Sequence, residues 1–187
     1  VMKSCIFRFL TQIIFAVSLF FTSCVDSGNF NPVDLGLSVE WADCNVGALS
    51  PEGFGHYLAF GETEPKSFYS VLNYSGSDSI VNSFDKGGWR IPTREEYEEL
   101  IYGCDWICTS QNGVKGYKVV GPNGNSIFLP FAGYYQGQSL MLQSLAGLFW
   151  VNEHHYYNVG VFLCSPSRTE LGEDTPYYGL TVRLVRD

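Results

Sequence analysis

The sequence predicts an α+β domain with mixed or antiparallel twisted sheets, about two short helices and long loops. Short segments alternate apolar and polar residues, which is the pattern of half-buried strands. The 187 residues include 20 glycines, and aromatic and charged residues each make up 16% of the chain, as in a β-rich globular domain with many turns. One segment near the middle of the chain carries strong signals for the start and end of a helix.

The first expected strand or hairpin covers residues 33–42. Its alternation places four apolar side chains on one face, namely Leu35, Leu37, Val39 and Trp41. A short helix is expected next, because Ser50 can act as its N-cap and Pro51 suits the first helical position. Gly53 and Gly55 would keep this helix short.

The second expected helix begins after Pro92, which disfavours a helical conformation at the residue before it. Thr93 can cap this helix, and Glu96 lies three residues later, as a capping box requires. The apolar stripe that would face the core consists of Tyr97, Leu100 and Ile101. Gly103 is expected to end the helix.

We interpret this helix start as a structural motif made of Trp89, Arg90, Pro92, Thr93 and Glu96. A ligand contact is the less favoured role for Arg90. Its guanidinium is expected to bond loop carbonyls or to pair with an acid such as Glu62, because a planar fork of donors suits both partners.

Most of the remaining chain is expected to be strand. Asn112-Gly113 is a turn signal, and residues 121–124 join two strands in a β-hairpin. Residues 136–147 are expected to form a long loop. The expected strands cover residues 106–109, 116–120, 126–129, 148–151, 156–164 and 178–185.

The N-terminal residues 1–23 have the pattern of a signal peptide. Lys3 and Arg8 supply positive charge, and a mostly apolar stretch that ends at Phe21 is too short to span a membrane. The next residue after Thr22 and Ser23 is Cys24, an arrangement that resembles a bacterial lipobox in which Phe21 replaces the usual leucine. We therefore expect lipidation of Cys24; plain secretion and an uncleaved hydrophobic anchor are the alternatives.

Three parts of the chain follow from this interpretation. Residues 1–23 are the signal peptide, residues 24–32 are the lipidated cysteine and a flexible tether, and residues 33–187 are a single domain. The acyl chains would hold the protein to a membrane without a spanning helix. The expected location is the cell envelope of a Gram-negative bacterium, at the outer membrane or the cell surface.

The charge of the chain excludes some partners. The formal net charge is −8, and removal of residues 1–23, which contain two basic residues and no acid, lowers it to −10. An acidic surface argues against binding to nucleic acid and against electrostatic docking to anionic lipid.

Four cysteines remain once the leader and Cys24 are set aside. Three pairings are open to them. We favour the disulfides Cys44–Cys104 and Cys108–Cys164, and the alternative is four buried thiols. The histidines are too scattered to complete a zinc site with these cysteines, so no metal or cofactor is expected.

Several motifs occur along the domain in a characteristic order. They are residues 33–47, Gly61-Glu62-Thr63, Trp89-Arg90-Ile91-Pro92-Thr93, Gly116-Tyr117-Lys118-Val119 with residues 125–130, Ala132-Gly133-Tyr134 and residues 182–186. Over almost all of residues 33–187 the chain resembles the Fibrobacter succinogenes major paralogous domain family, which is widespread in bacterial surface proteins. The helix start at Arg90 is also similar to that of formylglycine-generating enzymes.

The resemblance implies a C-type-lectin-like fold and a surface module without one established ligand. It supplies no catalytic residues. Where the family commonly continues into serines after Phe149-Trp150, this chain has Val151 followed by polar residues. Residues 152–158 are therefore the most individual part of the domain.

Enzyme and calcium-lectin functions are disfavoured. The segment around Cys164 lacks the context of a formylglycine-generating enzyme, and the chain has no Gly-x-Ser-x-Gly motif or phosphate-binding loop. Two segments distantly resemble lectin calcium motifs, but Lys66 stands where one needs an amide and Val151 splits the other. His154 and His155 are adjacent, so they would point to opposite faces of a strand and could not easily share a metal ion.

Tyrosine pairs give the best indication of a binding surface. On a strand, each pair places one ring in the core and one outside, and an outward tyrosine suits sugars or protein partners. The alternative is that these rings serve sheet packing alone. The candidate ligand-binding residues are Tyr134, Tyr135, Glu153, His155, Tyr156, Tyr157 and Tyr178. The predicted function is a non-enzymatic binding or interaction module for a glycan or protein; a structural subunit of a surface appendage or envelope complex is the alternative, and a formylglycine-generating-type enzyme comes third.

Overall fold

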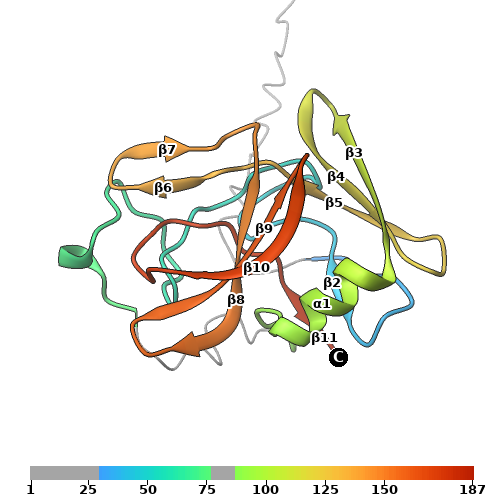
Figure 1. Ribbon diagram of the computed structural model, residues 1–187, viewed down its shortest axis with the longest axis horizontal. Coiled ribbons are helices and arrows are strands. Elements are labelled where there is room, and N and C mark those ends of the chain that lie inside the picture. Colours follow the sequence, from blue (N-terminus) through green and yellow to red (C-terminus); the bar gives the residue numbers. More distant parts are fainter. Residues whose placement is uncertain (1–29, 77–86) are drawn as a thin grey trace, which may run out of the picture.

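A computed structural model describes residues 30–76 and 87–187 (Figure 1). The predicted signal peptide, Cys24 and the tether up to residue 29 lie outside these residues. The described chain forms four mostly antiparallel sheets with one α-helix and one 3₁₀ turn, which agrees with the predicted α+β class. Among the described residues, no helix combines the length and apolar character that a membrane crossing requires.

The first sheet joins the two ends of the domain. Its strands, in the order β1-β2-β11, are β1 (Pro32–Asp34), β2 (Glu40–Ala42) and β11 (Val185–Arg186). Trp41 on the central strand faces both Val33 and Val185. Because β1 begins at Pro32 and Phe30 packs edge-on against Trp89 at 5.5 Å, residues 30–32 belong to the folded domain and not to the tether.

The helix start is confirmed. Helix α1 covers Arg94–Gly103. Thr93 accepts a hydrogen bond from the Glu96 backbone at 3.3 Å, and the Glu96 carboxylate accepts one from the Thr93 backbone at 2.8 Å. Tyr97 and Leu100 are fully buried beneath it. The local sequence thus specifies both the cap and the buried face.

Arg90 pairs within this motif and not with Glu62. Its two terminal nitrogens donate to the Glu96 carboxylate at 2.6 and 2.8 Å, and one of them also donates to Asp187 at 2.7 Å. These bonds raise the pKa of Arg90. Glu62 instead accepts from Lys66 at 2.6 Å. The arginine therefore ties the helix start to the C-terminal residue.

Replacing Thr93 with alanine is expected to lower the free energy of unfolding by about 1 kcal/mol, because the Glu96 backbone N–H loses its cap. Urea denaturation followed by tryptophan fluorescence measures this. Thr63→Ala, at an exposed threonine outside the helix, is the matched control and should leave the midpoint unchanged. An equal loss for both variants would contradict the capping role.

Two further sheets contain the long hairpins. The second sheet has the order β3-β4-β5 and the third has the order β10-β9-β8. Asn112 and Gly113, both with positive φ, form the predicted turn between β3 and β4. The bounds are β3 (Asp105–Gln111), β4 (Val114–Val120), β5 (Ser126–Pro130), β8 (Gly147–His155), β9 (Asn158–Ser165) and β10 (Arg168–Asp174).

Several expectations need correction. The predicted helix at Ser50-Pro51 is a turn. Gly55 adopts φ +71°, which is not helical, and the Glu52 carboxylate accepts hydrogen bonds from the side-chain amides of Gln111 and Asn112 at 3.1 and 2.7 Å. The predicted loop 136–147 contains part of a two-stranded sheet, β6 (Tyr134–Gln136) with β7 (Ser139–Met141). The short helix elsewhere is the 3₁₀ turn Val71–Asn73.

The predicted strand 178–185 is instead a connection between sheets. Leu180 bridges to Leu58, Thr181 bridges to Phe149, and Val185 alone enters β11. Thr181 and Arg183 alternate with leucine and valine, a pattern that in a half-buried strand places polar residues on the outer face. Both are fully buried, because Leu180 bonds to Leu58 on one side of this segment and Thr181 bonds to Leu148 and Trp150 on the other.

Arg183 is a buried cation that the sequence did not reveal. Its guanidinium donates to the Asn45 side chain, the Ala42 carbonyl and the Phe128 carbonyl at 2.9, 2.9 and 2.8 Å. Burial lowers the pKa of Arg183 to about 10, so the group still carries its proton at neutral pH. It joins β2, the following loop and β5 through one side chain.

The four cysteines of the domain are free thiols, so neither favoured disulfide is present. The alternative of four buried thiols also fails in part: Cys44 and Cys164 are buried, Cys104 is intermediate and Cys108 is exposed. Cys108 lies on β3, at the outer edge of its sheet.

Candidate functional site

The seven candidate residues do not meet in one groove. Tyr134 and Tyr135 lie on β6, whereas Tyr156 and Tyr157 form the turn between β8 and β9. In Figure 1 these two regions occupy separate corners of the molecule. The two groups therefore have to be considered one at a time.

The tyrosines on and near β6 pack against other tyrosines. Tyr135 lies against Tyr57 and Tyr69, with ring centroids 4.9 and 5.7 Å apart. Tyr134 lies 5.6 Å from Tyr178 on the other side. All three candidate rings of this group are half-buried. Because these rings pack against other side chains of the domain, little of their surface is available to a ligand.

The turn between β8 and β9 carries two exposed aromatic rings. Relative exposure is 105% for Tyr156 and 92% for Tyr157. Tyr156 has φ +50°, a left-handed conformation that glycine, asparagine or aspartate usually takes in such turns. Holding a bulky residue there costs about 1 kcal/mol or more, and such strain concentrates at functional sites. Residues 152–158 are thus a hairpin end and not an irregular loop.

Ion pairs brace this hairpin at its base. Glu153 accepts from Arg94 Nε at 2.7 and 2.9 Å and from His155 Nε2 at 2.9 Å. His155 also lies 3.7 Å from Glu173 on β10. Arg94 is the first residue of α1, so the brace connects the helix start to β8 and β10.

The strand geometry explains this brace. Glu153 and His155 are two residues apart on β8, so their side chains share one face. Gly160 on β9 leaves room for the carboxylate, because a Cβ there would lie 3.2 Å from the Glu153 Oε2. His154 points the other way and packs against Phe60 at 5.0 Å. Among residues 30–76 and 87–187, no group of histidine, cysteine and carboxylate side chains has the geometry of a metal site.

Acid is expected to loosen the hairpin through Glu153. Hydrogen bonds from Arg94 and then from His155 lower the pKa of this carboxyl below its ordinary value of 4.5. Its stabilising contribution is therefore complete above that value and is lost as the pH falls through the lower, folded-state pKa. Amide hydrogen exchange of β8 and β9 between pH 3 and 7, with exchange rates corrected for pH, measures this loss.

Glu153→Gln is the matched variant for that measurement. It should exchange faster at neutral pH and show a smaller additional loss in acid. An acid profile identical to that of the parent protein would contradict the role assigned to Glu153.

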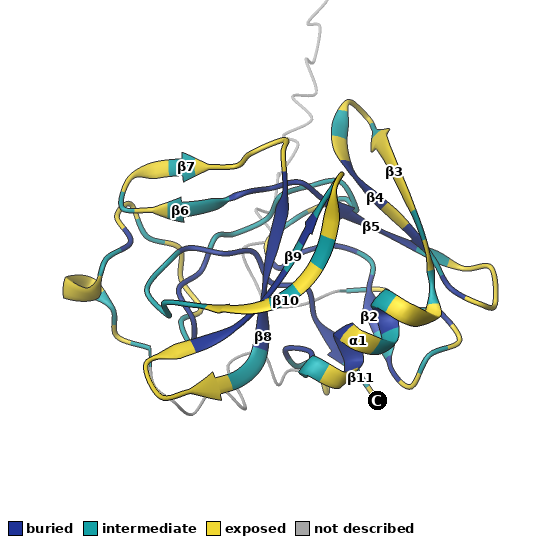
Figure 2. Cartoon of the chain, in the orientation of Figure 1, coloured by how far each residue is buried: buried dark blue, intermediate teal, exposed yellow. Residues whose placement is uncertain are grey.

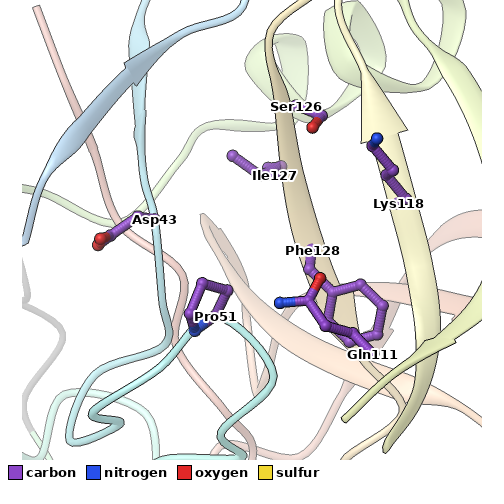
Figure 3. Close-up of a pocket in the computed structure, with 7 residues that line it drawn as sticks. All are labelled: Asp43, Pro51, Gln111, Lys118, Ser126, Ile127 and Phe128. Carbon is purple, nitrogen blue, oxygen red and sulfur yellow. The ribbon is translucent and has the colours of Figure 1, made fainter.

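Two surface hollows lie away from these candidates. One, of about 240 Å³, is lined in part by Asp43, Pro51 and Lys118 (Figure 3). The other, of about 300 Å³, surrounds the Glu62–Lys66 pair. Neither is lined by any of the seven candidate residues, and in Figure 3 the Asp43 and Lys118 side chains lie on opposite sides of the hollow.

No protein-family model, curated protein or solved structure matches the chain. Sequence reasoning missed Arg94 and Glu173 in the brace. The i, i+2 spacing of Glu153 and His155 was a usable signal for a shared face, but their partners come from distant segments.

Proposed function

We propose that the protein is a non-enzymatic binding module whose contact surface is the hairpin tip formed by Tyr156 and Tyr157. The observation that carries the proposal is that both rings are fully exposed on a strained, braced turn. We further propose a lipid anchor at Cys24 that holds the module to the envelope of a Gram-negative bacterium, at the outer membrane or the cell surface.

The physical basis is preorganisation of an aromatic contact. Tyrosine provides a large, stiff contact area with a polar tip at low entropic cost. The Arg94–Glu153–His155 contacts fix the strand ends that carry the two rings, so less freedom is lost on binding.

The charge around the tip limits the ligand. Glu173 and Asp174 on the neighbouring strand β10 lie opposite Gly160 and Val159, near the tip, and the chain is acidic overall. A polyanionic ligand would be repelled. A neutral glycan, or a protein surface without strong negative charge, fits this environment.

We do not propose catalysis at Cys164, the cysteine considered as the reactive residue if the protein were a formylglycine-generating-type enzyme. The thiol is fully buried, and burial raises its pKa to about 12. It is therefore protonated and inaccessible at neutral pH, which is the opposite of a reactive cysteine.

We also propose the finer fold and family assignments, namely a C-type-lectin-like domain of the Fibrobacter succinogenes major paralogous type. Their support is the order of the motifs over residues 33–187. The antiparallel sheets with one α-helix are consistent with them.

A binding screen tests the proposed function. The domain is applied to an array of neutral and acidic glycans and to bacterial envelope proteins, beside the variant Tyr156→Ser/Tyr157→Ser. Tyr102→Ser is the control, because Tyr102 is 85% exposed on α1, away from the tip. We expect the parent and the control to retain a ligand that the double variant loses. Retention by none of the three proteins would contradict the proposal.

Metabolic labelling tests the anchor separately. Cells given labelled palmitate should label the wild-type chain and not Cys24→Ala, and globomycin should block processing of the wild type. Label that persists on Cys24→Ala would overturn the anchor without affecting the binding proposal.

An assembly subunit remains our second candidate function. It is favoured by the edge of β3 (Asp105–Gln111), which has no strand neighbour on one side among the described residues.

A further inference from the structure

The strand β3 is an open edge of its sheet. The order β3-β4-β5 leaves one side of β3 without a strand neighbour among the described residues. Every residue of this seven-residue strand is exposed or intermediate. Figure 2 shows this exposure along the outer side of the hairpin.

The turn determines which backbone groups point outward. In a two-residue hairpin with positive φ at both turn positions, the flanking residues, here Gln111 and Val114, exchange both backbone hydrogen bonds. Hydrogen-bonded pairs then alternate along the ladder. Trp106, Cys108 and Ser110 consequently direct their N–H and C=O groups away from β4, toward the open side.

This edge lacks the usual protection against pairing. From Trp106 to Gln111 it has no charged residue and no proline, and Ile107 is 50% exposed. The contrast is β10, at an edge of the third sheet, which carries four charged side chains over its seven residues: Arg168, Glu170, Glu173 and Asp174. The edge strand β10 therefore carries charges that oppose pairing, and residues 106–111 of the edge strand β3 do not.

We propose that β3 pairs antiparallel with β3 of a second copy of this chain, about a two-fold axis through Cys108. Cys108 is the central residue of Asp105–Gln111, so this register uses the whole strand. It places Asp105 opposite Gln111 of the second copy and brings no two like charges face to face. In this register the outward backbone groups of Trp106, Cys108 and Ser110 meet those of Ser110, Cys108 and Trp106 in the second copy, as a two-fold interface requires.

The same register brings the two Cys108 residues directly opposite each other. Hydrogen-bonded antiparallel partners have Cα atoms about 5.5 Å apart, within the range that a disulfide spans. Two Cys108 thiols and one glutathione disulfide then give one intermolecular disulfide and two glutathione thiols. Cys44 and Cys164 are buried, and burial raises the pKa of the Cys104 thiol to about 11, so Cys108 is favoured for this exchange.

Strand pairing alone buries less surface than a stable dimer interface, so the reduced dimer should be weak. The Cys108 disulfide is therefore a useful test, because it traps the weak β3–β3 dimer covalently. The inference does not depend on the hairpin tip, and the variant Tyr156→Ser/Tyr157→Ser should dimerise like the parent.

The experiment is incubation of the purified domain in a buffer of oxidised and reduced glutathione, followed by non-reducing electrophoresis, light scattering and mass-spectrometric mapping. We expect a dimer joined by Cys108–Cys108, retained in Cys104→Ser and absent in Cys108→Ser. Ile107→Lys should lower the dimer yield at least tenfold with an unchanged circular dichroism spectrum, because it adds like charges diagonally across the axis.

Several outcomes would overturn the proposal. They are a parent protein that stays monomeric with glutathione on Cys108, a dimer linked through another cysteine, or an Ile107→Lys variant that crosslinks as well as the parent. If the protein stays monomeric, an extended segment of a different protein becomes the expected partner of the β3 edge.

Discussion

Replacing Arg183 with methionine is expected to lower the free energy of unfolding by about 3 kcal/mol. The methionine fills similar space but leaves the Asn45 side chain and the Ala42 and Phe128 carbonyls without their donor. A buried acceptor without a partner costs about 1–3 kcal/mol, and removal of a buried charge offsets part of the sum. Chemical denaturation measures the difference.

The control is Arg168→Met, at an arginine whose side chain is 60% exposed and pairs with Glu170 at 3.0 Å. An exposed ion pair contributes about 0–1 kcal/mol, so this variant should unfold close to the parent. If both variants unfold at the same denaturant concentration, Arg183 does not hold the fold together as we describe.

Replacing Phe162 with alanine is expected to cost about 3–5 kcal/mol. The ring is fully buried and lies 4.6 Å from Tyr97 and 6.2 Å from Phe149, so the substitution opens a cavity beneath α1. Differential scanning calorimetry should show a lower melting temperature and a smaller unfolding enthalpy.

Phe68→Ala is the matched control for that cavity, because Phe68 is 44% exposed in a loop. It should cost about 1 kcal/mol or less. If the Phe162→Ala and Phe68→Ala variants had the same melting temperature, Phe162 on β9 would not be an essential part of the core beneath α1.

The parts of the fold that the sequence predicted are those specified by local interactions. Thr93 and Glu96 are three residues apart, and each completes the other's hydrogen bonds. Asn112-Gly113 sets the register of a hairpin by its own backbone preference. Such elements need no knowledge of distant segments.

The errors lie where distant segments decide the outcome. Ser50 and Pro51 favour a helix locally, but Glu52 bonds to the β3–β4 turn and Gly55 reverses the backbone. Arg183 alternates with apolar neighbours as an outward residue would, yet it has protein on both sides. A period of two identifies two faces but does not say that only one is covered.

The candidate site was predicted in part for the same reason. Tyr156 and Tyr157 were identified as an adjacent pair with one ring expected inside and one outside, but the structure places both rings outside, at a turn and not on a strand. Tyr135 was proposed by the same rule, but its partners Tyr57 and Tyr69 come from a segment more than 60 residues earlier. Adjacent tyrosines thus do not by themselves say which ring faces outward, because a turn exposes both rings of one pair and other segments partly cover both rings of the other.

The most direct test of the recognition surface is the dissociation constant, by isothermal titration, for the glycan or envelope protein that the parent domain retains in the screen. We predict that Tyr156→Ser/Tyr157→Ser raises this constant at least tenfold, about 1.4 kcal/mol, whereas Tyr102→Ser leaves it unchanged. Equal constants for the parent and the double variant would contradict the assignment of the β8–β9 tip as the contact surface.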